Sequence, residues 1–164
     1  MPEGGTSTPT WPRSTVAHRR FGASSLLNDV VELVPWRGPL EDGAGARVRA
    51  LAAESHENPS IAAVSITDSA GGHAMLSPEV LAAQLAERGQ EAIVHITCRD
   101  RNRNELLSLG WRLASAGIKN LLVLSGDYPT EGYLGAARPV FDLDSVSLLE
   151  LYQASNRGRS RMAW

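Results

Sequence analysis

The sequence has one cysteine, no long apolar run and almost no net charge, and each shortage excludes a class of protein. With Cys98 alone among 164 residues, no intrachain disulfide and no cysteine-rich zinc site can form, so we expect no metal centre. No apolar stretch approaches the ~20 residues that cross a bilayer, so we expect no membrane partner. A formal net charge of −2 argues against a nucleic-acid partner, because such domains are usually clearly basic.

The remaining composition is that of an ordinary globular domain, with 43% hydrophobic and 21% charged residues. The first 28 residues lack the apolar core of a signal peptide and carry Arg13, Arg19 and Arg20, with Glu3 as their only acid. They predict a disordered leader, with a transit peptide as the alternative. Residues 155–164 form a basic tail that carries three arginines and no acid. We expect one domain over residues 29–154 and a cytoplasmic location.

A strand-like run recurs about every 30 residues within this domain. The four runs are "DVVELV" (29–34), "IAAVSIT" (61–67), "EAIVHIT" (91–97) and "NLLVLS" (120–125). This spacing is typical of βα units with parallel strands, and strands so apolar are expected to be buried on both faces. The sequence therefore predicts an α/β fold with about four βα units.

Helical patterns separate the predicted strands. In "ARVRALAAES" (46–55), Val48, Leu51 and Ala52 can share a face. Ser77 and Pro78 are suited to the N-cap and first position of the next helix, and Gly89 is placed to end it. The later helices are predicted over residues 102–117 and 143–154. Such units build either an open doubly wound sheet or part of a TIM-type barrel. No G-x-G-x-x-G motif follows the first strand, which weakens the first option.

Polar and ionisable residues gather where the predicted strands end. They are Thr67 and Asp68 after the second strand, His95, Thr97, Cys98 and Arg99 at the third, and Ser125, Gly126 and Asp127 at the fourth; Glu32 lies within the first. Parallel strands bring their carboxyl ends to one face, which holds the active site in βα barrels. The stretch "VHITCRDRNRNELL" (94–107) is therefore expected to form part of a small-molecule site.

Some of these residues have a second reading. Glu32 is either a structural ion-pair partner or a general acid whose pKa burial raises toward neutrality. Cys98 is expected to be a small apolar packing group, with a nucleophile as the less favoured alternative. Arg99 either contacts cofactor phosphates or belongs to a solvated helix start with Asp100 as its counter-charge, and Arg103 is assigned to the solvated group.

The motifs "VELVPWRG", "VSITDSAGGHAMLSP", "VHITCRDRNRNELLSLGWRLASAGIKNLLVLSGDYP" and "FDLDSVSLLELY" occur in one order between residues 29 and 152. Together they resemble the methylenetetrahydrofolate reductase family. The most specific part is H-x-T-C, a helix, G-I-x-N, and then a strand ending in G-D-x-P. The resemblance implies a flavin-dependent βα barrel in which FAD lies at the carboxyl ends of the strands. It implies that NAD(P)H is the reductant and that the folate substrate is methylenetetrahydrofolate.

The resemblance also implies roles for individual residues. Glu32 matches the general acid toward the folate, and Asp127 matches an aspartate beside the flavin that affects folate binding. The residues implied to bind FAD are Thr67, His95, Ser125, Gly126, Asp127 and Phe141. Ser125 stands where many members have arginine, and Trp36 stands where many have proline.

The number of βα units departs most from the family, because about four are predicted where a family barrel has eight. The expected architecture is therefore half of a TIM-type barrel. Its partner would be a second copy of the chain, in a homo-oligomer, or another half-barrel. The alternative function is that of a non-catalytic remnant or subunit.

Overall fold

The computed structural model describes residues 29–129, 135 and 137–156, and these form one parallel sheet with helices between its strands. The strands are β1 (Asp29–Leu33), β2 (Ile61–Ile66), β3 (Ala92–Thr97) and β4 (Asn120–Leu124), in the spatial order β1-β2-β3-β4. The helices are α1 (Ala46–Glu57), α2 (Pro78–Glu87), α3 (Arg103–Ser115) and α4 (Ser145–Asn156). Short 3₁₀ turns, η1 (Gly43–Gly45) and η2 (Ala70–Gly72), follow β1 and β2. The predicted α/β class and the four parallel βα units are confirmed.

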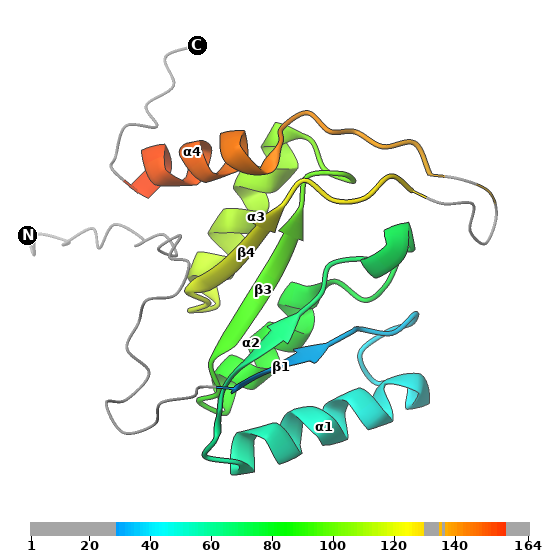
Figure 1. Ribbon diagram of the computed structural model, residues 1–164, viewed down its shortest axis with the longest axis vertical. Coiled ribbons are helices and arrows are strands. Elements are labelled where there is room, and N and C mark those ends of the chain that lie inside the picture. The colour runs from blue at the N-terminus through cyan, green and yellow to red at the C-terminus, as the bar shows by residue number, and fades with distance from the viewer. Residues whose placement is uncertain (1–28, 130–134, 136, 157–164) are drawn as a thin grey trace, which may run out of the picture.

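Consecutive strands are neighbours throughout the sheet, as in a segment of a βα barrel. Figure 1 shows α1 beside β1 at one end of the sheet and α4 beside β4 at the other. The predicted domain ended at residue 154, and α4 continues to Asn156. The predicted leader and residues 157–164 of the predicted basic tail lie outside the described residues.

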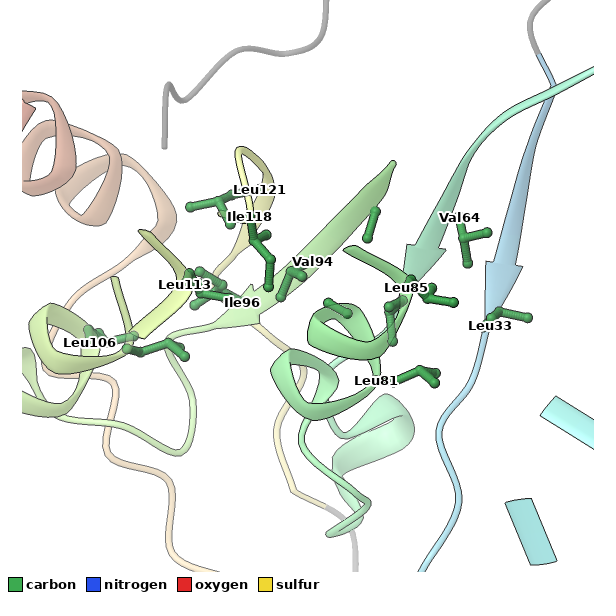
Figure 2. Packing of buried hydrophobic residues seen from close by; sticks show 14 of the residues in the cluster. Leu33, Val64, Leu81, Leu85, Val94, Ile96, Leu106, Leu113, Ile118 and Leu121 are labelled. Atoms are coloured by element: carbon green, nitrogen blue, oxygen red, sulfur yellow. The ribbon is translucent and has the colours of Figure 1, made fainter. Parts of the chain in front are cut away.

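The core lies between one face of the sheet and the helices (Figure 2). Strand residues alternate between the two faces, so Val64 and Ile66 of β2 face the same side as Val94 and Ile96 of β3. These side chains are buried, together with most of the leucines of α2 and α3. The buried leucines of these two helices are Leu81, Leu85, Leu106, Leu109 and Leu113. The helix-covered face of the sheet is thus fully apolar.

The opposite face, called here the inner face, carries the polar residues and is open at both edges. Burial on both faces, as predicted from sequence, holds for most of β2 and β3 but is wrong for β1 and β4. Val30 on β1 and Leu122 and Leu124 on β4 are exposed large hydrophobics. The edge strands have a neighbour on one side only, and no described element covers their inner-face side chains.

Two local predictions also need correction. Leu51 is exposed, and the buried residues of α1 are Ala52 and Ser55. The reason is that α1 packs at the edge of the sheet, where its main strand contacts are with β1 and β2, so its buried stripe is narrow. Ser77 does hold the N-cap position, but its hydroxyl donates a hydrogen bond to the Glu79 carboxylate instead of capping a backbone N–H. Gly89, with φ of +77°, follows the end of α2 as predicted.

Candidate functional site at the carboxyl ends of the strands

Six of the seven predicted site residues line a single cavity at the carboxyl ends of the strands. The cavity measures about 470 Å³, within the range of ligand pockets. All four strands or the loops that follow them contribute to it. The predicted residues in its wall are Glu32, Thr67, His95, Ser125, Gly126 and Asp127, and they are joined there by Asp68, Ser69, Thr97 and Arg99. Residues that lie about 30 positions apart in the sequence thus come together because the strands pair in parallel.

Glu32 lies on the inner face of β1, opposite Ser65 in the register of β1 and β2. Its side chain was expected to be buried, and this is wrong, because the residue is exposed in the structure. The cause is its position on an edge strand whose inner face has no cover among the described residues. A general acid at Glu32 would therefore need a ligand or a partner to exclude water from it.

Ser65 and His95 link β2 to β3 beneath the cavity. The Ser65 Oγ and the His95 Nε2 share a buried hydrogen bond of 2.6 Å. Burial lowers the pKa of His95 from its ordinary value of 6.5, although the negative charges of Glu32 and Asp68 oppose the shift. The imidazole is therefore neutral at pH 7 and can both donate and accept a hydrogen bond. Ser65 was not predicted from sequence; the only signal was a polar residue two positions before Thr67 on the same strand face.

Thr67 is the clearest sign that the cavity accepts a ligand. Its Oγ1 is buried and has no hydrogen-bond partner among the described residues. Buried hydroxyl groups are nearly always hydrogen-bonded, and an unsatisfied one costs about 1–3 kcal/mol. A polar ligand atom in the cavity would satisfy this hydroxyl, so Thr67 fits a role in cofactor binding.

Asp68 organises the strand ends although it received no site role from sequence. Its Oδ2 accepts hydrogen bonds from the Thr97 backbone N–H, at 2.9 Å, and from the Thr97 hydroxyl, at 3.0 Å. Arg101 also pairs with it, with 2.5 Å between Nη1 and Oδ2. Burial acts to lower the pKa of Arg101, but the hydrogen bond and the charge of Asp68 outweigh it and raise the pKa. Asp68 therefore has a structural role that fixes β2 against β3.

Gly126 lets the backbone after β4 approach β3 closely. Its φ is +92°, and an added Cβ would lie 3.1 Å from the Arg99 Cβ and 3.2 Å from the Thr97 Cβ. Both the conformation and the space favour glycine. Ser125, just before it, accepts a 3.2 Å hydrogen bond from the Ser145 backbone N–H at the start of α4. The Gly126–Asp127 segment is thus held at the cavity wall.

Phe141 is the predicted site residue that the structure does not bring to the cavity wall. It lies in the segment before α4, in a left-handed backbone conformation with φ of +42°. Its ring packs against Tyr128, with 5.3 Å between the ring centroids and 53° between the planes. Phe141 therefore contacts the residue after Asp127, and its implied role toward FAD remains a prediction.

Cys98 packs in the hydrophobic core, as the apolar reading predicted. Burial raises the pKa of its thiol to about 11, so the reactive thiolate is scarce at neutral pH. Among the described residues no cluster of histidine, cysteine and acidic side chains could hold a metal ion. None of the described helices is both long and apolar enough to cross a membrane.

A larger hollow of about 780 Å³ is lined in part by the same η2 loop. Its lining includes Arg37, His73 and Met75, and much of the rest is glycine or alanine. Gly71 lines the cavity while Gly72 lines this hollow, so the two share one loop. The smaller cavity is the better candidate site because the polar strand-end residues converge there.

Four parallel strands in consecutive order, with a polar cavity at their carboxyl ends, match a segment of a βα barrel, the fold whose active sites lie at that face. The family model of methylenetetrahydrofolate reductase matches residues 44–155. The chain therefore belongs to the methylenetetrahydrofolate reductase family. Five of the six cavity residues predicted from sequence lie within the match, and Glu32 lies before it. No curated protein and no solved structure matches the chain.

Proposed function

We propose that the chain binds FAD in the strand-end cavity and contributes to the reduction of 5,10-methylenetetrahydrofolate to 5-methyltetrahydrofolate by NAD(P)H. The observation that carries the proposal is the convergence of Glu32, Thr67, His95, Gly126 and Asp127 on one cavity in a chain of this family. Bound FAD would take hydride from the nicotinamide nucleotide and deliver it to the folate. The protein then has to bind the flavin, exclude water and supply a proton.

The binding roles follow from the chemistry of each side chain. Thr67 offers a hydroxyl that lacks a protein partner among the described residues. Neutral His95 is oriented by Ser65 and offers its other ring nitrogen to a ligand. Gly126 lets the backbone after β4 lie directly against Thr97 and Arg99, which keeps the Gly126–Asp127 segment at the cavity wall. These contacts suit an uncharged polar ring system such as the isoalloxazine.

Glu32 and Asp127 are the proposed catalytic carboxyl groups. Both line the cavity, on opposite edge strands of the sheet or just beyond them. Glu32 would donate a proton to the folate once a ligand has displaced water around it, because desolvation favours the protonated carboxyl. Asp127 would accept a hydrogen bond from the substrate.

A non-catalytic half-barrel is the second candidate function, and the open inner face favours it. Glu32 is exposed, and Val30 and Leu122 on the edge strands are exposed on the same face. Enzyme sites that transfer hydride normally exclude water, and ligand sites bury about 70–90% of their ligand. The purified chain alone would then bind flavin weakly and turn over little.

Glu32→Gln tests the proposed function when the two half-reactions are measured separately under anaerobic conditions. The amide is nearly isosteric but cannot donate a carboxylic proton. Flavin reduction by NADH or NADPH should stay within about twofold of the unmodified chain, while folate reduction should fall by roughly 10²–10⁴-fold. Equal loss in both half-reactions would give Glu32 a structural role. No half-reaction in the unmodified chain would favour the non-catalytic candidate.

A further inference from the structure

Arg99 carries a charge that is almost fully enclosed at the wall of the cavity. Its side chain is only 2% exposed, which is unusual for arginine unless the guanidinium is paired. Asp100 supplies the pair: the Arg99 Nε lies 3.0 Å and 3.1 Å from the two carboxylate oxygens, and Nη2 lies 2.6 Å from Oδ2. The hydrogen bond to Asp100 raises the pKa of Arg99, so the group stays charged at all physiological pH values.

The same guanidinium reaches two loops that follow strands on either side of β3. Nη2 donates to the Ser69 carbonyl at 3.1 Å, and Nη1 lies 3.4 Å from the Asp127 carbonyl. The first loop follows β2 and the second follows β4, and these strands do not pair with each other. The Arg99 side chain therefore spans the end of β3 and connects the loop after β2 to the loop after β4.

The backbone of Arg99 holds a third segment. Its carbonyl accepts a 2.7 Å hydrogen bond from the Val140 N–H, in the stretch that returns to α4. Ser69, a non-glycine residue with φ of +47°, adopts a conformation that few residues take without a nearby restraint. The hydrogen bond that the Arg99 guanidinium donates to the Ser69 carbonyl is such a restraint. One residue thus joins the segments that carry Ser69, Asp127 and Val140.

We propose that Arg99 is a positioning residue that fixes the loops after β2 and β4 so that Thr67 and Asp127 face one ligand. The proposal deepens the proposed function and rests on it for the ligand. Four of the five N–H donors of the guanidinium meet protein acceptors among the described residues, which leaves little capacity for a cofactor phosphate. Lysine cannot replace it, because one ammonium group lacks the planar fork that serves three acceptors in fixed directions.

Hydrogen exchange tests the restraint without any ligand. In Arg99→Met, amides in residues 69–73 and 126–128 should exchange about tenfold faster, the loss expected for a charge-assisted hydrogen bond. The β3 and α2 amides should keep their protection. Arg103→Met is the matched control, since its exposed side chain lies at the start of the next helix and should leave both loops unchanged. Unchanged exchange in both loops of Arg99→Met would overturn the proposal.

Titration with two flavins separates positioning from phosphate binding. Riboflavin has the same ring system as FAD but no phosphate. Positioning predicts that Arg99→Met weakens both flavins by the same factor, about tenfold, and that Arg99→Lys does not restore affinity. Weakening of FAD alone would mean that Arg99 binds phosphate, and would overturn the proposal. If the unmodified chain binds neither flavin, the proposed function fails while the exchange result still decides the restraint.

A double-mutant cycle tests whether Arg99 acts through Asp127. If it does, Asp127→Asn should lower the rate of folate reduction by a smaller factor in the Arg99→Met background than in the unmodified chain. Simple multiplication of the two losses would show that Arg99 does not act through that carboxylate.

Discussion

Asp68 and Arg101 form an ion pair that joins the end of β2 to the segment after β3, with 2.5 Å between Nη1 and Oδ2. The Asp68 side chain is 1% exposed and the Arg101 side chain 15% exposed. The pair is therefore shielded from solvent, in contrast to the exposed Arg112–Glu105 pair on α3. Four donor groups converge on Asp68, two from Thr97 and two from Arg101.

Asp68→Asn should destabilise the protein by about 3 kcal/mol, since it leaves the Arg101 charge without its counter-ion in a mostly buried position. Urea unfolding followed by circular dichroism measures the change. Glu105→Gln is the control, because it removes an exposed pair worth at most about 1 kcal/mol. Equal effects of the two substitutions would contradict the role given to Asp68.

Gly126→Ala should cost more stability than Gly89→Ala. Both glycines have positive φ, +92° and +77°, so alanine at either site pays about 1–2 kcal/mol in backbone strain. An added Cβ meets nothing within 4 Å at Gly89, whereas at Gly126 it meets Arg99 and Thr97. Crowding should add roughly 1 kcal/mol. Matching losses in thermal unfolding would show that the loop after β4 can move away.

His95 should make the protein less stable as the pH falls below 6.5, the ordinary pKa of histidine. Its pKa is lowered in the folded state by burial, so the unfolded chain takes up a proton first as the pH falls. The contribution of neutral His95 to the free energy of unfolding is complete above pH 6.5. It declines as the pH falls toward the folded-state pKa and levels off below that pKa. His95→Gln should flatten this part of the stability profile, while exposed His56→Gln should not. An unchanged profile for His95→Gln would reject this assignment.

The sequence predicted the four βα units because each strand is a short apolar run and each helix is separated from the next strand by turn residues. Parallel connectivity then placed the strand ends together, which explains why Thr67, His95 and Asp127 could be assigned to one site. Exposure could not be predicted in the same way. Glu32 and Leu51 looked like buried residues in their local patterns, but both lie at the edge of the sheet.

The hydrogen bonds and ion pairs beneath the site could not be predicted from local sequence patterns either. Asp68 pairs with Arg101 across 33 positions, and Arg99 reaches Ser69 across 30. Such pairs depend on strand register and side-chain direction, which a single sequence does not specify. The sequence left Arg99 open between a contact to cofactor phosphates and a solvated helix start, and in the structure its side chain is enclosed.

The open edges of the sheet predict self-association of the purified chain. Most of the exposed large hydrophobics lie on the first and fourth βα units, including Val30, Leu51, Leu122, Leu124 and Val146. Both edge strands also lack a partner on one side among the described residues. Sedimentation should show a dimer or larger species. Leu122→Glu should weaken the association, and Val80→Glu on α2 should not. A compact, stable monomer would contradict this expectation.

The most direct test of a flavin site at the strand ends is a fluorescence titration of the purified chain with FAD, repeated with Thr67→Val. Valine keeps the shape of threonine and removes only the hydroxyl that lacks a partner among the described residues. We expect saturable but weak binding of FAD to the unmodified chain. We also expect the variant to bind up to about tenfold more weakly, although its folding stability without ligand should be equal or higher, because the unsatisfied hydroxyl is gone. Absence of saturable binding, or equal affinity of the two proteins, would contradict a flavin site at the strand ends.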